Sequence, residues 1–284
     1  MIKIGTCGFS FKDWKGTVYP ENIKDRDILP FYNKTLGMDI VEIDVSYYQL
    51  LPQNVAESWN SKTDRDFLFT IKCHKDITLN EMGKVDPLAL NNGDVFDKFL
   101  YSYTPIINNN KLLTFLAQFG PAFNKNKKNV QYLSLLKEKF KSLPLTIEFR
   151  HKSWLEKENR EDTFTHLRRL NLGYAVVDEP QVRSLAPFIL NNTNPVGYFR
   201  FHGRNRDWFT ATGDERYNYE YSDDELREFI PFIKELEKRT AVTTVFFNNC
   251  HSGAALKNSV KLRQMLGIAG YNANLTGHQL KFPF

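Results

Sequence analysis

The 284-residue sequence lacks the features that mark secreted and membrane-spanning proteins. Its three cysteines, Cys7, Cys73 and Cys250, are widely separated, so no disulfide framework or CxxC-type metal motif is present. No apolar run approaches the ~18 residues that cross a bilayer. The N-terminus has no basic segment followed by an apolar core. We therefore expect a cytoplasmic protein with reduced thiols and no membrane partner.

The motifs of several common enzyme classes are also missing. The sequence has no Walker loop, no GxSxG elbow and no HExxH pair, and GTCGF (5–9) lacks the spacing of a dinucleotide fingerprint. No cofactor is therefore obligatory, and a divalent metal is left as a less favoured possibility. The net charge of +5 permits an anionic ligand or contact with nucleic acid and requires neither.

The sequence contains short apolar runs that are separated by helix-like segments. Hydrophobic residues make up 42% of the chain, enough for a large core. Alternating strands and helices predict a parallel sheet, and eight units in this length favour a single (β/α)8 TIM-like barrel over residues 1–284. The eight strand-like runs are 2–8, 39–48, 67–75, 112–120, 143–151, 173–180, 196–203 and 243–250.

The connections between the runs differ in length. Amphipathic patterns predict helices over 126–141, 160–171, 222–239 and 252–266. Ser222 with Glu225 forms a capping-box signature, and Ser252 is expected to open the last helix. Long loops are expected after the third and seventh strands, at 76–111 and 203–221, the first with one helix. The proline-rich connection at 180–195 is short, so the sixth helix is expected to be degraded.

Side chains alternate across a strand, so each run can be sorted into two faces. In the seventh run Phe199 and Phe201 share one face, while Arg200 and His202 share the other. We expect the aromatic face to pack under the helices and the polar face to point into the barrel. The same sorting, with position near a strand end, predicts a polar mouth built from Glu42, Asp44, Lys72, His74, Gln118, Glu148, Arg150, Asp178 and Asn248.

Two interpretations of this polar interior remain open. Barrel enzymes place their active sites at the carboxyl ends of the strands, where these residues cluster. Buried ion pairs are rarely more stabilising than apolar packing, which favours a functional role. Alternatively, the charges pair with one another and only fix the register of the strands.

The motifs resemble the family called domain of unknown function 72, the YecE-like proteins. The resemblance covers nearly the whole chain and implies a TIM-barrel-like fold without a settled activity. Departures are Cys7 and Phe9 in place of the usual serine and tryptophan, and Gly120 and Ala122 in the QFGPAF segment. The matching pieces are IGTCGFSFKDWKGTVYP, VEIDVSYYQLLP, QFGPAF, IEFRHKSW, VVDEP, YFRFHGRN, YNYEYSDDEL and FFNNCHSGAALKNSVKL.

The favoured hypothesis is an enzyme that acts on a small phosphate- or carboxylate-bearing molecule. Guanidinium groups match such anions, so Arg150 and Arg200 are expected to hold the ligand. Glu148, Asp178 and His202 are the candidate acid–base residues. Further candidate ligand contacts are Lys72, His74, Gln118, Arg204, Trp208, Tyr219 and Asn248.

Two alternatives stay open. Glu148, Asp178 and His202 follow successive strands, a layout that resembles the metal site of endonuclease IV-type barrels and would suit phosphodiester chemistry. Asn248 in place of a carboxylate, and the nearby arginines, weaken that interpretation. The third possibility is a barrel that binds a ligand without catalysis. The sequence predicts no oligomeric state.

Overall fold

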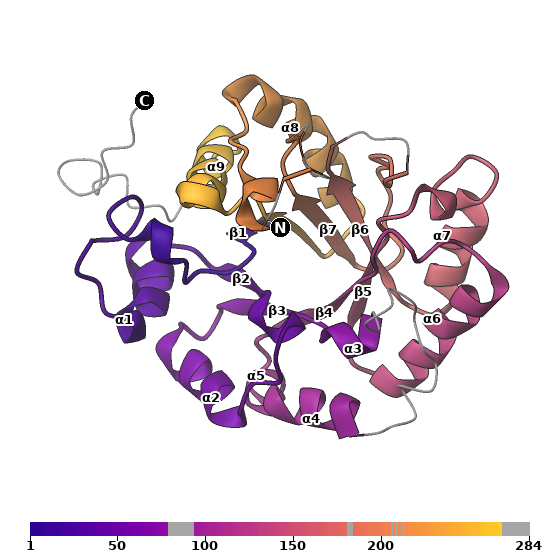
Figure 1. The fold of residues 1–284 in the computed structure, drawn as a ribbon, viewed down its shortest axis with the longest axis horizontal. Coiled ribbons are helices and arrows are strands. Elements are labelled where there is room, and N and C mark those ends of the chain that lie inside the picture. The colour runs from indigo at the N-terminus through magenta and orange to yellow at the C-terminus, as the bar shows by residue number, and fades with distance from the viewer. Residues whose placement is uncertain (79–93, 181–183, 206, 208–209, 212, 269–284) are drawn as a thin grey trace.

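The structure is a computed structural model that describes residues 1–78, 94–180, 184–205, 207, 210–211 and 213–268. Eight parallel strands form one sheet in the order β1-β8-β7-β6-β5-β4-β3-β2, and helices surround it (Figure 1). The predicted TIM-like barrel is therefore confirmed. The strands are β1 (Ile2–Thr6), β2 (Ile40–Ile43), β3 (Leu68–Lys72), β4 (Leu112–Gln118), β5 (Leu145–Glu148), β6 (Gly173–Asp178), β7 (Val196–Phe201) and β8 (Val242–Phe247).

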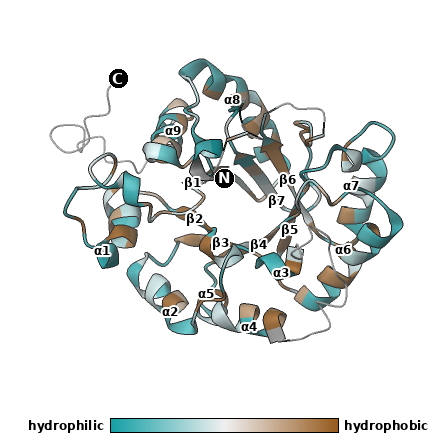
Figure 2. Cartoon of the chain, viewed as in Figure 1, coloured by the Kyte–Doolittle hydropathy of each residue, from teal (hydrophilic) through white to brown (hydrophobic). Residues whose placement is uncertain are grey.

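The outer layer is helical, and its helices contain both apolar residues in brown and polar residues in teal (Figure 2). Between β6 and β7 the described residues contain no helix, as predicted from the prolines. The segment after β3 holds more helix than the single one expected. The helices are α1 (Asp25–Pro30), α2 (Gln53–Lys62), α3 (Lys75–Thr78), α4 (Asp94–Ser102), α5 (Thr104–Asn108), α6 (Lys127–Phe140), α7 (Arg160–Arg169), α8 (Asp223–Glu237) and α9 (Ala254–Met265).

The barrel closes where β1 approaches β2. The amide of Gly8 donates to the carbonyl of Glu42 at 2.7 Å, next to a bridge between Cys7 and Glu42. A Cβ atom on Gly5 would lie 2.4 Å from the carbonyl oxygen of Ile40, closer than van der Waals contact allows. The missing side chain of Gly5 thus lets the two strands meet.

The predicted start of the last helix is wrong. Ser252 has a φ of 52° and lies in a short 3-10 turn, and α9 begins at Ala254 after the left-handed Gly253. The Ser252 amide donates to the carboxylate of Asp13 at 2.6 Å instead of entering the helix. A Cβ on Gly253 would meet Val18 at 2.7 Å, so this turn is shaped by contact with the N-terminal segment.

The predicted facing of β7 is confirmed. Phe201 packs on Phe229 of α8 with ring centroids 4.3 Å apart, whereas Arg200 is fully buried among the polar side chains inside the barrel. In β8, Phe246 packs inside against Tyr198. The sheet therefore presents an apolar surface to the helices and a mixed surface to the barrel axis, where charged side chains lie beside aromatic ones.

Candidate active site

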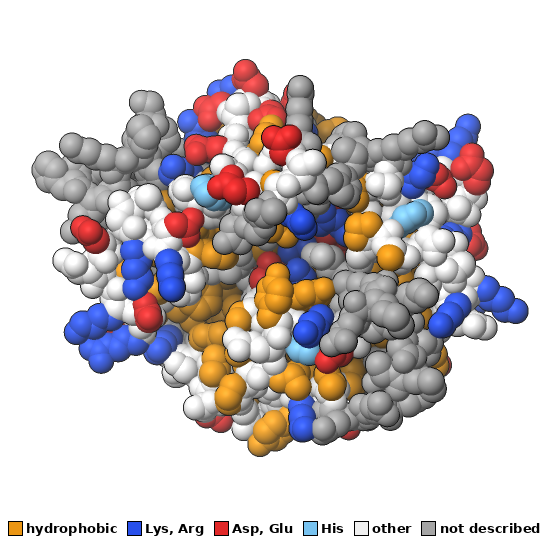
Figure 3. Space-filling model, viewed as in Figure 1, with side chains coloured by type: hydrophobic (Ala, Val, Ile, Leu, Met, Phe, Trp, Pro, Cys, Tyr) orange, Lys and Arg blue, Asp and Glu red, His pale blue; other side chains and the backbone are white. Residues whose placement is uncertain are grey.

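A pocket of about 180 Å³ opens at the carboxyl ends of the strands. It lies over β1, β2, β3 and β8, and Lys and Arg side chains are visible in the hollow at the centre of this face (Figure 3). A pocket at this end of a barrel is where enzymes of this architecture bind their ligands. It is lined by Cys7, Phe11, Asp13, Asp44, Tyr48, Lys72, Tyr217, Asn248, Cys250 and His251.

Below this pocket, Arg200 is the centre of a buried charge network. Its Nη2 donates to Glu42 at 2.6 Å, and its Nη1 donates to Glu148 at 2.6 Å and to Gln118 at 2.7 Å. Arg200, Glu42 and Glu148 are all fully buried. The guanidinium donors expected to hold an anion are thus already bound to carboxylates of the protein.

Arg150 extends the same network. Its Nη1 lies 3.2 Å from Glu148 Oε1, and its Nη2 lies 2.5 Å from Glu179 Oε2. His202 Nε2 also lies 3.1 Å from Glu148 Oε1, while Asn248 donates to His202 Nδ1 at 2.8 Å. Arg150 Nη1 lies 3.1 Å from the same His202 Nε2, so this nitrogen contacts both a guanidinium and a carboxylate.

The carboxyl groups of the network fall into two kinds. Burial raises the pKa of Glu42 to about 7 and that of Glu179 to about 7, because the nearby arginines offset only part of the cost of desolvation. Burial also opposes the charge on Glu148, but Arg200, the His202 imidazole and Arg150 outweigh it and hold the pKa of this group well below its usual range. Burial and Arg150 lower the pKa of His202 to about 3.

Asp178 does not join this network. It pairs in register with Phe201, which faces the helices, whereas Val177 pairs with the inward-facing Arg200. The Asp178 carboxylate accepts hydrogen bonds from Tyr221 at 2.7 Å and from Arg204 at 3.1 Å. The expected convergence of Asp178 with Glu148 and Arg150 is therefore corrected, and the inward-facing residue is its neighbour Glu179.

The remaining predicted residues have varied surroundings. His74 is buried beside Asp76, with Nδ1 3.4 Å from its carboxylate. Tyr219 donates its hydroxyl to Glu225, whose backbone lies at the start of α8, and so anchors the loop after β7. Asn248 and Lys72 line the pocket. Trp208 lies outside the described residues.

Lys72 is the pocket cation with the most freedom to bind a ligand. Its Nζ lies 3.7 Å from Asp44 Oδ1 and 4.8 Å from the centre of the Tyr47 ring. Within the described part of the chain, no acceptor lies within hydrogen-bonding distance of this ammonium group. The three N–H donors of Lys72 therefore face a pocket that could supply an acceptor.

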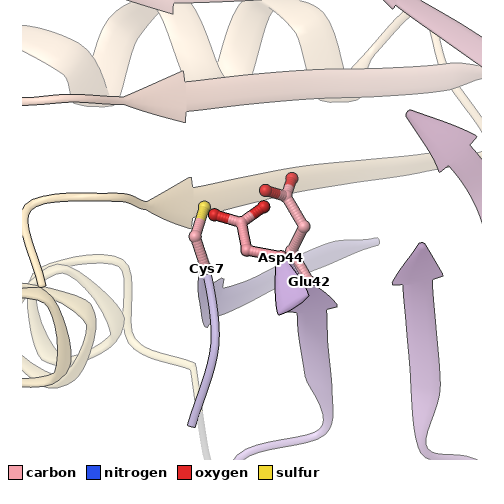
Figure 4. A group of neighbouring side chains, drawn as sticks. All are labelled: Cys7, Glu42 and Asp44. Atoms are coloured by element: carbon pink, nitrogen blue, oxygen red, sulfur yellow. The ribbon is translucent and has the colours of Figure 1, made fainter. Parts of the chain in front are cut away.

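One group of side chains has the composition of a metal site. Candidate ligand atoms of Cys7, Glu42 and Asp44 lie within 4.8 Å of one another (Figure 4). Arg200 Nη2, however, lies 2.6 Å from Glu42, 3.5 Å from Cys7 and 3.7 Å from Asp44. A guanidinium in contact with all three residues repels a divalent cation, so this group does not fit a metal.

Among the described residues this is also the sole group of three such side chains, so Glu148, Asp178 and His202 do not converge as a metal centre would require. Burial raises the pKa of the Cys7 thiol well above its usual value, which disfavours the thiolate that metals bind.

The predicted ligand contacts do not include Asp44 and Cys7, which both line the pocket. Asp44 was recognised as inward-facing but not as the carboxylate that reaches the pocket, because nothing in the strand pattern reveals where β2 ends. Tyr217 comes from the loop after β7. Cys7 directly follows β1, and its proximity to Glu42 depends on how closely β1 and β2 approach.

No helix in the described part of the chain is both long and apolar enough to cross a membrane. All three cysteines are free and buried.

Comparison with known proteins shows matches over nearly the whole chain. A family model described as protein of unknown function DUF72 matches residues 3–280. The UPF0759 protein YunF of Bacillus subtilis strain 168 is 32% identical over 276 residues, which cover 94% of this chain and 95% of that protein.

Two solved structures have the same fold. A DUF72 family protein from Thermotoga maritima MSB8 is 39% identical with a TM-score of 0.84, and the match covers 94% of this chain and 99% of that one. A DUF72 family protein from Enterococcus faecalis V583 is 29% identical with a TM-score of 0.83, covering 95% and 96% of the two chains.

Proposed function

Because the chain belongs to DUF72, a family described as being of unknown function, we propose from its barrel mouth that it is an enzyme that binds a small anionic molecule and moves protons on it. The observation that carries this proposal is the Lys72 ammonium group. It is only 8% exposed, lines the pocket and has no hydrogen-bond acceptor among the described residues. A buried cation of this kind is stabilised when a ligand supplies an anionic oxygen.

The other pocket residues indicate what else the ligand carries. Asn248 donates its amide nitrogen to His202, which leaves its amide oxygen to accept from a ligand hydroxyl. Tyr48 and Tyr217 add aromatic surface. The cavity of about 180 Å³ is many times the ~10–15 Å³ that a single water molecule needs, so it has room for a small organic molecule. These properties favour a hydroxylated phosphate or carboxylate of monosaccharide size.

Arg150 and Arg200 lie below the pocket and act on the ligand through their electrostatic field. Arg200 is fully buried and Arg150 nearly so, and both contact Glu148. We assign Glu148 and His202 to positioning the two guanidinium groups, whose fields extend to the pocket floor. Asp178 holds Arg204 and Tyr221 at the base of the loop after β7.

The free, buried cysteines suit a reducing compartment, and the cytoplasm is the proposed location.

A ligand screen tests the proposal. Thermal unfolding is measured with inorganic phosphate, sugar phosphates and sugar acids, for the natural protein and for Lys72→Met. We expect at least one of these anions to raise the unfolding temperature of the natural protein and to leave that of Lys72→Met unchanged.

Lys152→Met is the matched control, because Lys152 follows β5 and pairs with Glu156 outside the pocket. It should respond to the anion like the natural protein. An equal response in Lys72→Met would overturn the proposed anion site. Binding without turnover of any compound would instead support the non-catalytic barrel.

A further inference from the structure

We propose that Glu42 and Asp44 share one proton at neutral pH, and that Asp44 delivers this proton to a molecule in the pocket and takes it back. The delivery step rests on the proposed function, whereas the shared proton does not. Glu42 lies in β2 and Asp44 directly follows that strand, and the Asp44 carboxyl group lies close to both the Glu42 carboxyl group and the Cys7 thiol (Figure 4).

Too little positive charge surrounds the pair to keep both groups ionised. Arg200 is shared, because Nη2 contacts Glu42 at 2.6 Å while Nη1 contacts Glu148 at 2.6 Å. For Asp44, the nearest cations are Lys72 and Arg200, each 3.7 Å away from Oδ1. Two carboxylates close together in a buried site do not both ionise easily, so a proton on one of them is favoured.

An unpartnered atom points to the same conclusion. Asp44 Oδ1 is buried and accepts no hydrogen bond from any described residue. A buried carboxylate oxygen without a donor costs free energy, typically ~1–3 kcal/mol. A carboxyl proton shared with Glu42 would supply the missing donor from the neighbouring group that lies in the same cluster.

Glu42 and Asp44 have different surroundings, so we assign them different roles in the proton transfer. Glu42 is fully buried, and burial, opposed in part by Arg200, raises its pKa to about 7, so it is the store of the proton. Burial acts on Asp44 too, but Lys72 and Arg200 outweigh it and lower the pKa of Asp44. Neighbouring carboxyl groups whose pKa values are driven apart are a common source of acid–base pairs.

Only Asp44 offers the proton a way out. Its side chain is 24% exposed and lines the pocket, whereas Glu42 is enclosed by Tyr198, Arg200 and Cys7. The proton moves from the Glu42 carboxyl to the Asp44 carboxylate and from there to a basic atom of the ligand. Reversal of the same two transfers restores Glu42, so the pair is unchanged after one cycle.

The other titratable groups that face the pair keep their protonation state near neutral pH. Tyr198 donates its hydroxyl to Glu42, and burial raises the pKa of this tyrosine well above its usual value. The Cys7 thiol likewise stays protonated. Glu148 is held ionised by its arginines, and His202 is neutral. None of these groups releases a proton near neutral pH, which leaves Glu42 as the source.

Infrared spectroscopy tests the shared proton without a ligand. The carbonyl stretch of a protonated carboxyl group is followed between about pH 5 and about pH 9 in the natural protein, Glu42→Gln, Asp44→Asn and Asp162→Asn. Glu42 and Glu179 should both contribute to this band at neutral pH, and Glu42→Gln should remove the contribution of Glu42. In Asp44→Asn the band should titrate at lower pH, since the adjacent negative charge is gone.

The control Asp162→Asn removes a carboxylate that pairs with Lys125 at the surface, and should leave the spectrum unchanged. If Glu42→Gln does not fold, the downward shift in Asp44→Asn still tests the proposal. A spectrum that is the same in the natural protein, Glu42→Gln and Asp44→Asn would overturn it. This result is distinct from failure of the anion site, which the Lys72→Met screen reports.

Discussion

At the scale of single residues, Arg200 determines the character of the barrel interior. It is fully buried and contacts Glu42, Glu148 and Gln118 through two nitrogen atoms. Charges taken out of water need partners of this kind, because an isolated buried charge costs several kcal/mol. The network thus both stabilises the strands that carry it and sets the electrostatic field below the pocket.

Replacement of Arg200 by methionine should destabilise the fold by about 3–5 kcal/mol, because it leaves Glu42 and Glu148 buried without their shared cation. Chemical denaturation measures this loss. Arg227→Met is the control, since Arg227 forms exposed ion pairs worth only ~0–1 kcal/mol. Equal midpoints for the two variants would contradict the account of the network.

Glu42→Gln should change how stability depends on pH. The unfolded carboxyl group ionises near pH 4.5, whereas the folded one keeps its proton to about pH 7. Between these values the folded state binds more protons, so this group lowers the free energy of unfolding as the pH rises. The stability of Glu42→Gln relative to the natural protein should therefore increase from about pH 4.5 to about pH 7 and then level off.

Thermal unfolding across this range checks the prediction. A stability difference that is constant with pH would show that Glu42 has an ordinary pKa.

At the scale of elements, the alternation of side chains along a strand explains which inward-facing residues the sequence predicted and which it missed. Alternation along β7 correctly turned Arg200 inward and Phe201 outward, because a regular strand has a fixed period. The sixth run offered neighbouring acids, Asp178 and Glu179, at the strand end. Only the register against β7 reveals that Glu179 points inward, and pairing between strands is not visible in one sequence.

The start of α8 is an element that sequence predicted and that can be tested alone. Ser222 accepts from the Glu225 amide while Glu225 accepts from the Ser222 amide, which completes the capping box. Ser222→Ala should reduce stability by about 1 kcal/mol. Ser61→Ala, near the exposed end of α2, should be close to neutral in the same denaturation experiment. Similar losses in both variants would argue against the cap.

The close approach of β1 and β2 can be tested by a substitution at Gly5. Gly5→Ala would place a methyl group 2.4 Å from the Ile40 carbonyl oxygen, and backbone gives way less readily than a side chain. We expect a loss of about 1–3 kcal/mol from the strain. The midpoint of urea unfolding measures it, and an unchanged midpoint would show that the strands separate without cost.

At the scale of the whole molecule, the barrel brings residues from both ends of the chain to one mouth. Cys7 and Asp44 directly follow β1 and β2, Lys72 is the last residue of β3, and Asn248 directly follows β8. The number of strand-like runs was enough to predict this architecture. The pocket itself depends on loop conformations and on barrel closure, which involve contacts between distant residues and leave no local pattern in the sequence.

The central claim is that Lys72 is where the mouth holds an anion. A crystal structure of the natural protein soaked in inorganic phosphate tests it most directly. The account predicts a phosphate oxygen within hydrogen-bonding distance, about 3 Å, of Lys72 Nζ. A structure in which phosphate binds elsewhere, or leaves the mouth filled only by water at saturating concentration, would contradict the claim.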